Sequence, residues 1–203
     1  MSVNVNTTER TAADYLQELS DLLLGARVTD REGRALSLEE GSARGVEMIL
    51  GVGGSARKMM LIGNGGSAAI VSHIQNDLCK AVGVRAMVFN DQSLLTALAN
   101  DDGYETVFET PVSLWAEPGD LLLAVSSSGR SENILRGARA AADRGCNVIT
   151  LSGFNAENPL RGMGDLNFYV ASHVYGYVEI AHSALAHLLT DRAMMIRSEA
   201  RLA

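Results

Sequence analysis

The sequence predicts a three-layer α/β/α sandwich with a parallel five-stranded sheet, preceded by a pair of N-terminal helices. From Lys58 onward, short apolar runs alternate with longer segments of helical periodicity, which is typical of βαβ units around a parallel sheet. Before that point, two helical patterns are joined by a polar link. We therefore expect a boundary after residue 53, with oligomerisation helices in 1–53 and the sheet domain in 54–203.

The two N-terminal helices are delimited by capping signals. Thr8 is a candidate cap for the first helix, whose apolar residues recur at helical spacing over 15–23 and end before Gly25. The polar link covers 29–33. Ser37 with Glu40 then matches a capping box, which predicts a second helix that ends near 53–54. The first helix has a leucine-rich face that needs a partner, so we expect a homo-oligomer, a tetramer in particular.

The five strands and the last helix follow from apolar patterning. The strands are predicted at 59–62, 86–89, 121–125, 148–151 and 168–170. A final helix is predicted over 176–196, with a core face formed by apolar residues at helical spacing.

Composition narrows the function classes. The chain has 203 residues, 47% of them hydrophobic and 20% charged, which indicates a globular fold with a core of its own. A net charge of −7 argues against non-specific nucleic-acid binding. No apolar run approaches the roughly 20 residues of a membrane span, and residues 1–6 lack the pattern of a secretory signal. Cys79 and Cys146 have no motif around them and are interpreted as free thiols, which favours a cytoplasmic protein.

Two loops that follow predicted strands carry small polar residues. In the first, an apolar strand ends in Ser126, Ser127, Ser128 and Gly129, and a helix begins at Ser131. Four hydroxyls and the free N–H groups of a new helix form a cradle suited to phosphate. The second loop, 61–67, reads LIGNGGS and follows its strand in the same way. Each loop alone is also consistent with a plain turn, but both belong at the carboxyl edge of the sheet, where ligands bind.

Histidines and carboxylates recur on two predicted helices. His73 and Asp77 are four residues apart and share a helix face. Glu179 and His187 are eight apart, about 80° around a helix, so both can face one site, whereas His182 lies on a neighbouring face. Such a set suits a divalent ion such as zinc, and the same groups suit proton transfer between adjacent carbons. Spacing alone leaves both alternatives open.

Together these motifs resemble the sugar isomerase (SIS) domain family, and within it the phosphoheptose isomerases. The resemblance rests on the 63–67 loop followed by His73, the segment 100–104 (NDDGY), the serine loop and the final helix with His187. It implies the predicted fold and a sugar phosphate as ligand. By position, the family's phosphate contacts fall on one serine of the first loop and on four of the serine loop: Ser67, Ser126, Ser127, Ser128 and Ser131. Its sugar contacts fall on Asn64 and Asp101, and Gly65 and Gly66 of the first loop belong to the expected substrate- and phosphate-binding residues.

The resemblance also implies a metal and catalytic set with departures from the family pattern. The positions are His73, Asp77, Glu179 and His187. Asp77 stands where the family has glutamate, and Glu179 replaces a glutamine. Ala81 stands at a family arginine, and Gly176 at an aspartate. A shorter carboxylate withdraws the group by about 1.5 Å, whereas an added anionic ligand strengthens cation binding.

Two functions of different classes follow. In the first, the chain is an aldose–ketose isomerase of a sugar phosphate, most specifically sedoheptulose 7-phosphate, with His187 and Asp77 as the acid–base pair and zinc held by the four residues above. If Asp77 is committed to the metal, Glu179 becomes the base. In the second, the chain is a non-catalytic phosphosugar-binding regulator, like the SIS partner of a bacterial replication initiator. That partner lacks the final histidine, so His187 favours the enzyme.

Overall fold

The computed structural model describes residues 11–53 and 56–202 of the chain. Its strands are β1 (Arg27–Asp30), β2 (Ala35–Leu36), β3 (Met59–Gly63), β4 (Ala86–Val88), β5 (Leu121–Ser126), β6 (Asn147–Ser152) and β7 (Leu166–Tyr169). Its α-helices are α1 (Ala12–Leu24), α2 (Leu38–Val52), α3 (Gly66–Asp77), α4 (Gln92–Asp101), α5 (Glu109–Trp115), α6 (Glu132–Asp143) and α7 (Tyr175–Leu202). A π-helical turn, Leu78–Val82, continues α3, and short 3-10 turns lie at Tyr104–Thr106 and Pro159–Gly162.

The strands form a single sheet with the order β2-β1-β7-β6-β5-β3-β4. The five predicted strands, β3 to β7, are parallel to one another, as expected. The chain winds outward from β3 to β4 on one side and from β5 to β7 on the other. The winding direction therefore reverses between β3 and β5, and ligands of such sheets bind at this point, beyond the carboxyl ends of the strands.

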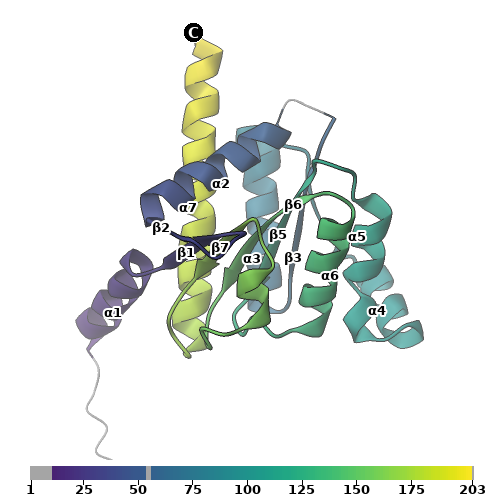
Figure 1. Ribbon diagram of the computed structural model, residues 1–203, viewed down its shortest axis with the longest axis horizontal. Coiled ribbons are helices and arrows are strands. Elements are labelled where there is room, and N and C mark those ends of the chain that lie inside the picture. Colours follow the sequence, from purple (N-terminus) through teal and green to yellow (C-terminus); the bar gives the residue numbers. More distant parts are fainter. Residues whose placement is uncertain (1–10, 54–55, 203) are drawn as a thin grey trace, which may run out of the picture.

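Helices cover both faces of the sheet (Figure 1). Alternation along β3 assigns Met59 and Leu61 to the core beneath α2, α3 and α7. Met60 and Ile62 point to the opposite face, into the core beneath α5 and α6, against which α4 also packs. Because both faces are buried, the strands read as continuous apolar runs, and that is why the sequence revealed them.

The predicted polar link at 29–33 was wrong: this region is a β-hairpin. β1 pairs antiparallel with β7 and with β2, so the sheet has seven strands rather than five. The buried Asp30 carboxylate holds the turn by accepting N–H groups of Glu32 and Arg34, and Gly33 has a φ of +78°. The hairpin lies within 1–53, so that N-terminal part contributes strands to the sheet as well as helices; the boundary after residue 53 stays a prediction.

The helix ends agree with most capping signals. Ser37 and Glu40 form the predicted capping box at the start of α2. Thr8, the candidate cap of the first helix, lies outside the described residues, and a capping box of Thr11 and Asp14 begins the described α1. The last helix runs to Leu202, beyond the predicted end at 196. No helix in residues 11–53 and 56–202 combines the length and the apolar character that crossing a membrane requires.

Candidate functional site

The serine loop connects β5 to α6 at the point where the winding reverses. The Gly129 N–H donates to Ser126 Oγ (3.2 Å), and the Arg130 N–H donates to Ser128 Oγ (3.2 Å), so two hydroxyls are fixed by the loop's own backbone. Ser131 is the N-cap residue of α6, but its hydroxyl accepts no N–H of that helix. Its hydroxyl lies 3.5 Å from Ser126 Oγ. The loop therefore presents hydroxyl groups and the start of a helix to one space, which suits a phosphate.

The glycine loop brings the start of α3 to the same space. Gly65 has φ +52° and ψ −120°, a conformation that side-chain-bearing residues rarely adopt. A Cβ on Gly63 would lie 2.7 Å from the backbone of Ser67, so only glycine allows the chain to turn this closely. The consequence is that Ser67, which is buried, faces the serine loop from the first turn of α3.

Both loops line one cavity of about 130 Å³. The lining residues are Asn64, Ser67, Val125, Ser126, Ser127, Ser128, Ser131, Tyr175 and Glu179. This cavity contains every serine that the sequence assigned to a phosphate cradle. Within the described chain no lysine or arginine lines it, so an anion there would be bound by hydroxyl groups and by the N-termini of α3 and α6.

Asn64 is held in place rather than free. Its side-chain amide pairs with that of Asn133 through two hydrogen bonds of 2.9 Å, and the Tyr104 hydroxyl donates to its Oδ1 (3.0 Å). Asn133 and Tyr104 were missed at the sequence level because they come from elements far away in the chain. Their signal was weak: Asn133 follows the serine loop by two residues, and Tyr104 ends the NDDGY segment.

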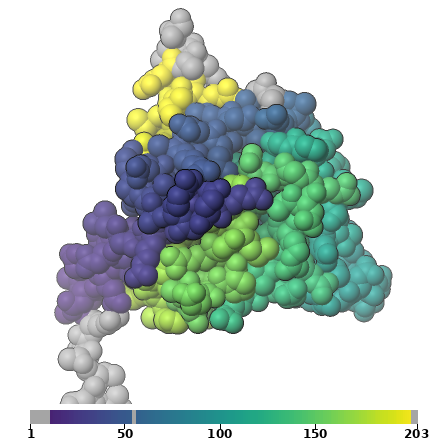
Figure 2. All heavy atoms as spheres, in the orientation of Figure 1, coloured from purple at the N-terminus to yellow at the C-terminus, as the bar shows by residue number. Residues whose placement is uncertain are grey.

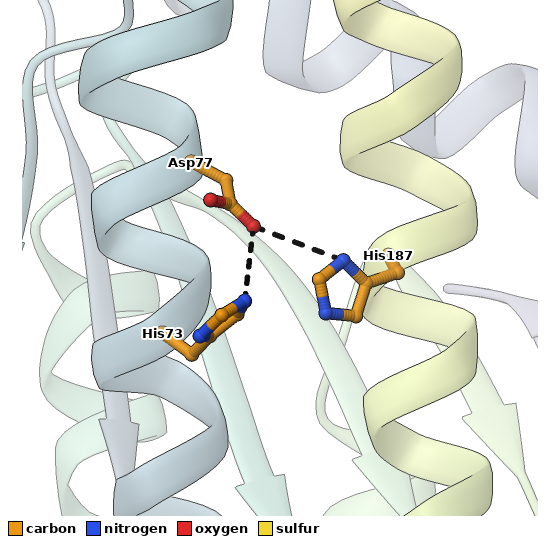
Figure 3. Close-up of side chains that lie close together, drawn as sticks. All are labelled: His73, Asp77 and His187. Carbon is orange, nitrogen blue, oxygen red and sulfur yellow. Dashed lines mark ion pairs between the residues drawn. The ribbon is translucent and has the colours of Figure 1, made fainter.

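The second part of the site is a cluster of His73, Asp77 and His187, shown in Figure 3. The Asp77 Oδ2 atom lies 3.4 Å from His73 Nε2 and 3.7 Å from His187 Nδ1. The two imidazole rings are 5.1 Å apart, centre to centre. α3 supplies the first two residues and α7 the third (Figure 3), as the predicted helix faces required.

This cluster fits a divalent cation by its chemistry and its spacing. One ligand atom from each residue lies within 4.8 Å of the others. Ligand atoms around a tetrahedral zinc are roughly 3.3 Å apart, given bonds of about 2.0–2.1 Å. Two imidazoles and one carboxylate are a common set for catalytic zinc, which keeps a fourth position open.

Glu179 is not in this cluster in the described conformation. Its carboxylate lies against Gly66 at the start of α3, where a Cβ would be 2.5 Å from Oε1, and it lines the serine-loop cavity. Of the four predicted metal ligands, the structure therefore brings three together. The role of Glu179 stays a prediction.

Three further residues of the sequence analysis lie apart from the cluster. Asp101 is exposed at the end of α4, accepts a hydrogen bond from Asn100 (2.8 Å), and is not among the residues that line the serine-loop cavity. His182 is fully buried in the core, and this burial lowers its pKa to about 4. His173 stacks on Phe154, with ring centres 5.7 Å apart.

Comparisons with known proteins agree with this geometry. Residues 14–153 match the family model of the SIS domain, and the chain belongs to the SIS domain family. Within that family it belongs with the phosphoheptose isomerases. The phosphoheptose isomerase of Syntrophotalea carbinolica is 32% identical over 181 residues, which cover 87% of this chain and 89% of the relative. That of Shewanella baltica is 31% identical over 165 residues, which cover 77% and 84%.

Solved structures lead to the same family. The phosphoheptose isomerase of Neisseria gonorrhoeae superposes with a TM-score of 0.75 at 27% identity and covers 89% of this chain and 95% of its own. The phosphoheptose isomerase of Francisella tularensis has a TM-score of 0.77 at 24% identity, covering 91% and 98%, and at this identity it supports the fold alone.

Proposed function

We propose that this protein is an aldose–ketose isomerase that converts sedoheptulose 7-phosphate into a heptose 7-phosphate. The observation that carries this proposal is that α3 and α7 serve both ends of such a substrate. Ser67 and Glu179 line the hydroxyl cavity, and His73, Asp77 and His187 lie further along the same two helices. His73 comes six positions after Ser67 on α3, which corresponds to a helical rise of about 9 Å. An open-chain sugar phosphate of seven carbons can span this separation. The similarity to phosphoheptose isomerases supports the same substrate.

The cavity binds the phosphate and so positions the reacting carbons. The phosphate oxygens accept hydrogen bonds from backbone N–H groups of the two loops and from five serine hydroxyls, those of Ser67, Ser126, Ser127, Ser128 and Ser131. Holding the non-reacting end makes proton transfer at the other end effectively intramolecular. Asn64 and Asp101 are proposed as sugar contacts, Asn64 being pre-positioned by Asn133 and Tyr104.

The histidine cluster provides the proton-transfer groups. Moving a proton between C1 and C2 through an enediol requires a base and an acid, and His187 and Asp77 are adjacent at the far end of the site. His73, Asp77, Glu179 and His187 would hold zinc, which would polarise the substrate's oxygen atoms. In the alternative in which Asp77 is committed to the metal, Glu179 becomes the base, and His73, Asp77 and His187 would hold the zinc.

We also propose that the protein works as a homotetramer in the cytoplasm. Both cysteines are unpaired, which is usual for proteins of a reducing compartment. The exposed apolar faces of α1 and α7 support self-association and are considered in the Discussion.

The proposal is tested by incubating the purified protein with sedoheptulose 7-phosphate and following aldose formation by NMR. The wild-type chain should form the aldose. His187→Ala should lower turnover by about 10²–10⁴-fold, while phosphate-end binding persists because the serine loops lie on other elements. Metal content, measured in the same samples, separates loss of a ligand from loss of a proton-transfer group. Binding of the sugar phosphate without any turnover by the wild-type protein would contradict the enzyme and support the non-catalytic regulator.

A further inference from the structure

The Glu179 side chain occupies a place where a substrate anion is expected. Its carboxylate lies beside Gly66, in the first turn of α3, and lines the cavity formed by the serine loop. A helix N-terminus attracts negative charge, and α3 has no side-chain cap of its own. The Glu179 carboxylate is therefore the anion that α3 attracts before any phosphate is bound.

A bound phosphate competes with this carboxylate. Ser67 from α3 and the serine loop face the same cavity as Glu179. Because no lysine or arginine lines the cavity in the described chain, no cation offsets the repulsion between the phosphate and the carboxylate. Like charges held this close destabilise each other, and the carboxylate is the group that can move.

The side chain has both freedom and a favourable destination. In the described part of the chain, no hydrogen bond or ion pair holds the Glu179 carboxylate. Glu179 and His187 are on α7, eight residues apart and about 80° around the helix. His73 lies beside His187 on the facing helix α3, and its side chain is 61% exposed and so accessible to a neighbour. Two imidazoles and a cation would stabilise a second carboxylate beside that of Asp77.

We propose that phosphate binding displaces Glu179 from the start of α3 toward His73, Asp77 and His187, so that the phosphate and a divalent cation bind cooperatively. This inference rests on the proposed function and adds an order of binding events: the cation site is completed when phosphate occupies the cavity. The effect depends on the negative charge of Glu179. A neutral glutamine at this position would neither be repelled by the phosphate nor add an anionic group to the histidine cluster.

The coupling is measured as the affinity for Zn²⁺, in competition with a chelating dye at micromolar metal, with and without saturating inorganic phosphate. The saturation of the dye reports the concentration of free zinc. Zinc that is bound by phosphate in solution is therefore not counted in the affinity. In the wild-type protein, phosphate should tighten zinc binding by about fivefold or more, which is the usual lower range of coupling between sites. Zinc should tighten phosphate binding by the same factor, since the coupling is reciprocal. In Glu179→Gln the zinc affinity should no longer respond to phosphate.

A second variant imitates the phosphate without adding it. In Gly66→Ala the new methyl group would lie 2.5 Å from Glu179 Oε1 and must displace the flexible carboxylate. We expect Gly66→Ala to bind zinc, in the absence of phosphate, as tightly as the wild-type protein does in its presence. Gly51→Ala is the matched control, because a Cβ at that helical glycine meets nothing within 4 Å; its zinc affinity should equal that of the wild type.

Three results would overturn the proposal. The first is a wild-type zinc affinity that does not respond to phosphate, and the second is a Glu179→Gln variant with the full wild-type response. The third is a folded Gly66→Ala variant whose zinc affinity, without phosphate, equals that of the wild type without phosphate. Circular dichroism confirms folding of each variant. None of these readouts uses turnover. A protein that isomerises sedoheptulose 7-phosphate without such coupling would thus contradict this inference and leave the proposed function standing.

Discussion

At the scale of single residues, the serine hydroxyls of the cradle can be tested one by one. Ser128→Ala and Ser131→Ala each remove a hydrogen bond to a charged oxygen, worth roughly 1.5–3 kcal/mol. We expect the substrate KM to rise by about ten- to a hundredfold, with a much smaller effect on kcat, because the phosphate is remote from the reacting carbons. Steady-state kinetics of the isomerisation measure both constants.

Ser93→Ala is a suitable control, since Ser93 is an exposed residue of α4 that does not line the cavity. It should leave KM unchanged. If Ser128→Ala and Ser131→Ala kept the wild-type KM and only lowered the melting temperature, these serines would be turn residues and the cradle would be refuted.

A buried histidine makes the stability of the fold depend on pH. His182 is fully buried, neither of its ring nitrogens has a hydrogen-bond partner among the described residues, and burial lowers its pKa from 6.5 to about 4. The folded state therefore favours the neutral ring. Its contribution to stability is fully present above pH 6.5 and is lost as pH falls toward 4. By linkage this amounts to about 3 kcal/mol.

Urea unfolding between pH 7 and pH 4 measures this dependence. The wild-type free energy of unfolding should fall over this range, and His182→Leu should show a flatter profile because a titrating group has been removed from the core. His173→Gln changes an exposed histidine and should keep the wild-type profile. An unaltered pH dependence in His182→Leu would contradict the assignment.

Residues of the site differ in how far the sequence reveals them. The serine loop and the His73–Asp77 pair are local patterns, so spacing was enough to find them. The Asn64–Asn133 amide pair joins residues 69 positions apart, and no local pattern encodes it. The position of Glu179 was predictable as a helix face but not as a rotamer, because the direction of the side chain depends on the open space beside Gly66.

At the scale of elements, the buried parallel strands were predictable and the edge hairpin was not. Strands β3 and β5 are buried on both faces and therefore read as apolar runs. β1 has only four residues, alternates exposed with buried positions, and ends at a charged turn, so it resembles a polar link. The π-helical turn after Asp77, which contacts α7, has no sequence signal of its own either.

Opposite the site, at the amino ends of β3 and β5, a buried ion pair joins Lys58 and Asp120, the residues that directly precede these strands. The Asp120 carboxylate, fully buried, accepts the Lys58 backbone N–H (2.8 Å) and lies 2.7 Å from Lys58 Nζ. Burial alone would lower the pKa of Lys58, but Asp120 and Glu117 raise it above its ordinary value. The lysine is thus kept charged by its partners.

Asp120→Ala should destabilise the fold by about 3–5 kcal/mol. It removes the acceptor of the Lys58 and Glu117 backbone N–H groups and leaves the Lys58 ammonium only the exposed Glu117 carboxylate as its partner. Urea unfolding measures the change. Asp102→Ala, at an exposed position, should change stability by less than about 0.5 kcal/mol. The KM of the folded Asp120→Ala protein should stay near the wild-type value, since Asp120 precedes β5 and the site follows it. A raised KM would mean that losing the ion pair at the amino ends of the strands also disturbs the site at their carboxyl ends.

At the scale of the whole molecule, two projecting helices leave apolar surface uncovered. None of the residues of α1 is buried; Leu16 and Leu24 are 62% and 74% exposed. The helix contacts the body through its stacked Tyr15–Tyr177 pair and through Leu19, Leu22 and Leu23, which pack against the core. Near the end of α7, Met195 and Ile196 are also exposed. Figures 1 and 2 show α1 and the end of α7 extending from the body of the molecule.

A second copy of the chain is the simplest partner for these surfaces, because a self-complementary interface buries the same apolar face on both chains. We therefore predict a homotetramer, two pairs of chains joined through α1 and α7. Sedimentation velocity at micromolar concentration should give a single species of four chains. Leu16→Glu combined with Leu24→Glu should release smaller species, since it buries charge at the interface, whereas Glu47→Gln on the exposed face of α2 should not. A wild-type protein that sediments as a stable monomer would contradict the predicted tetramer.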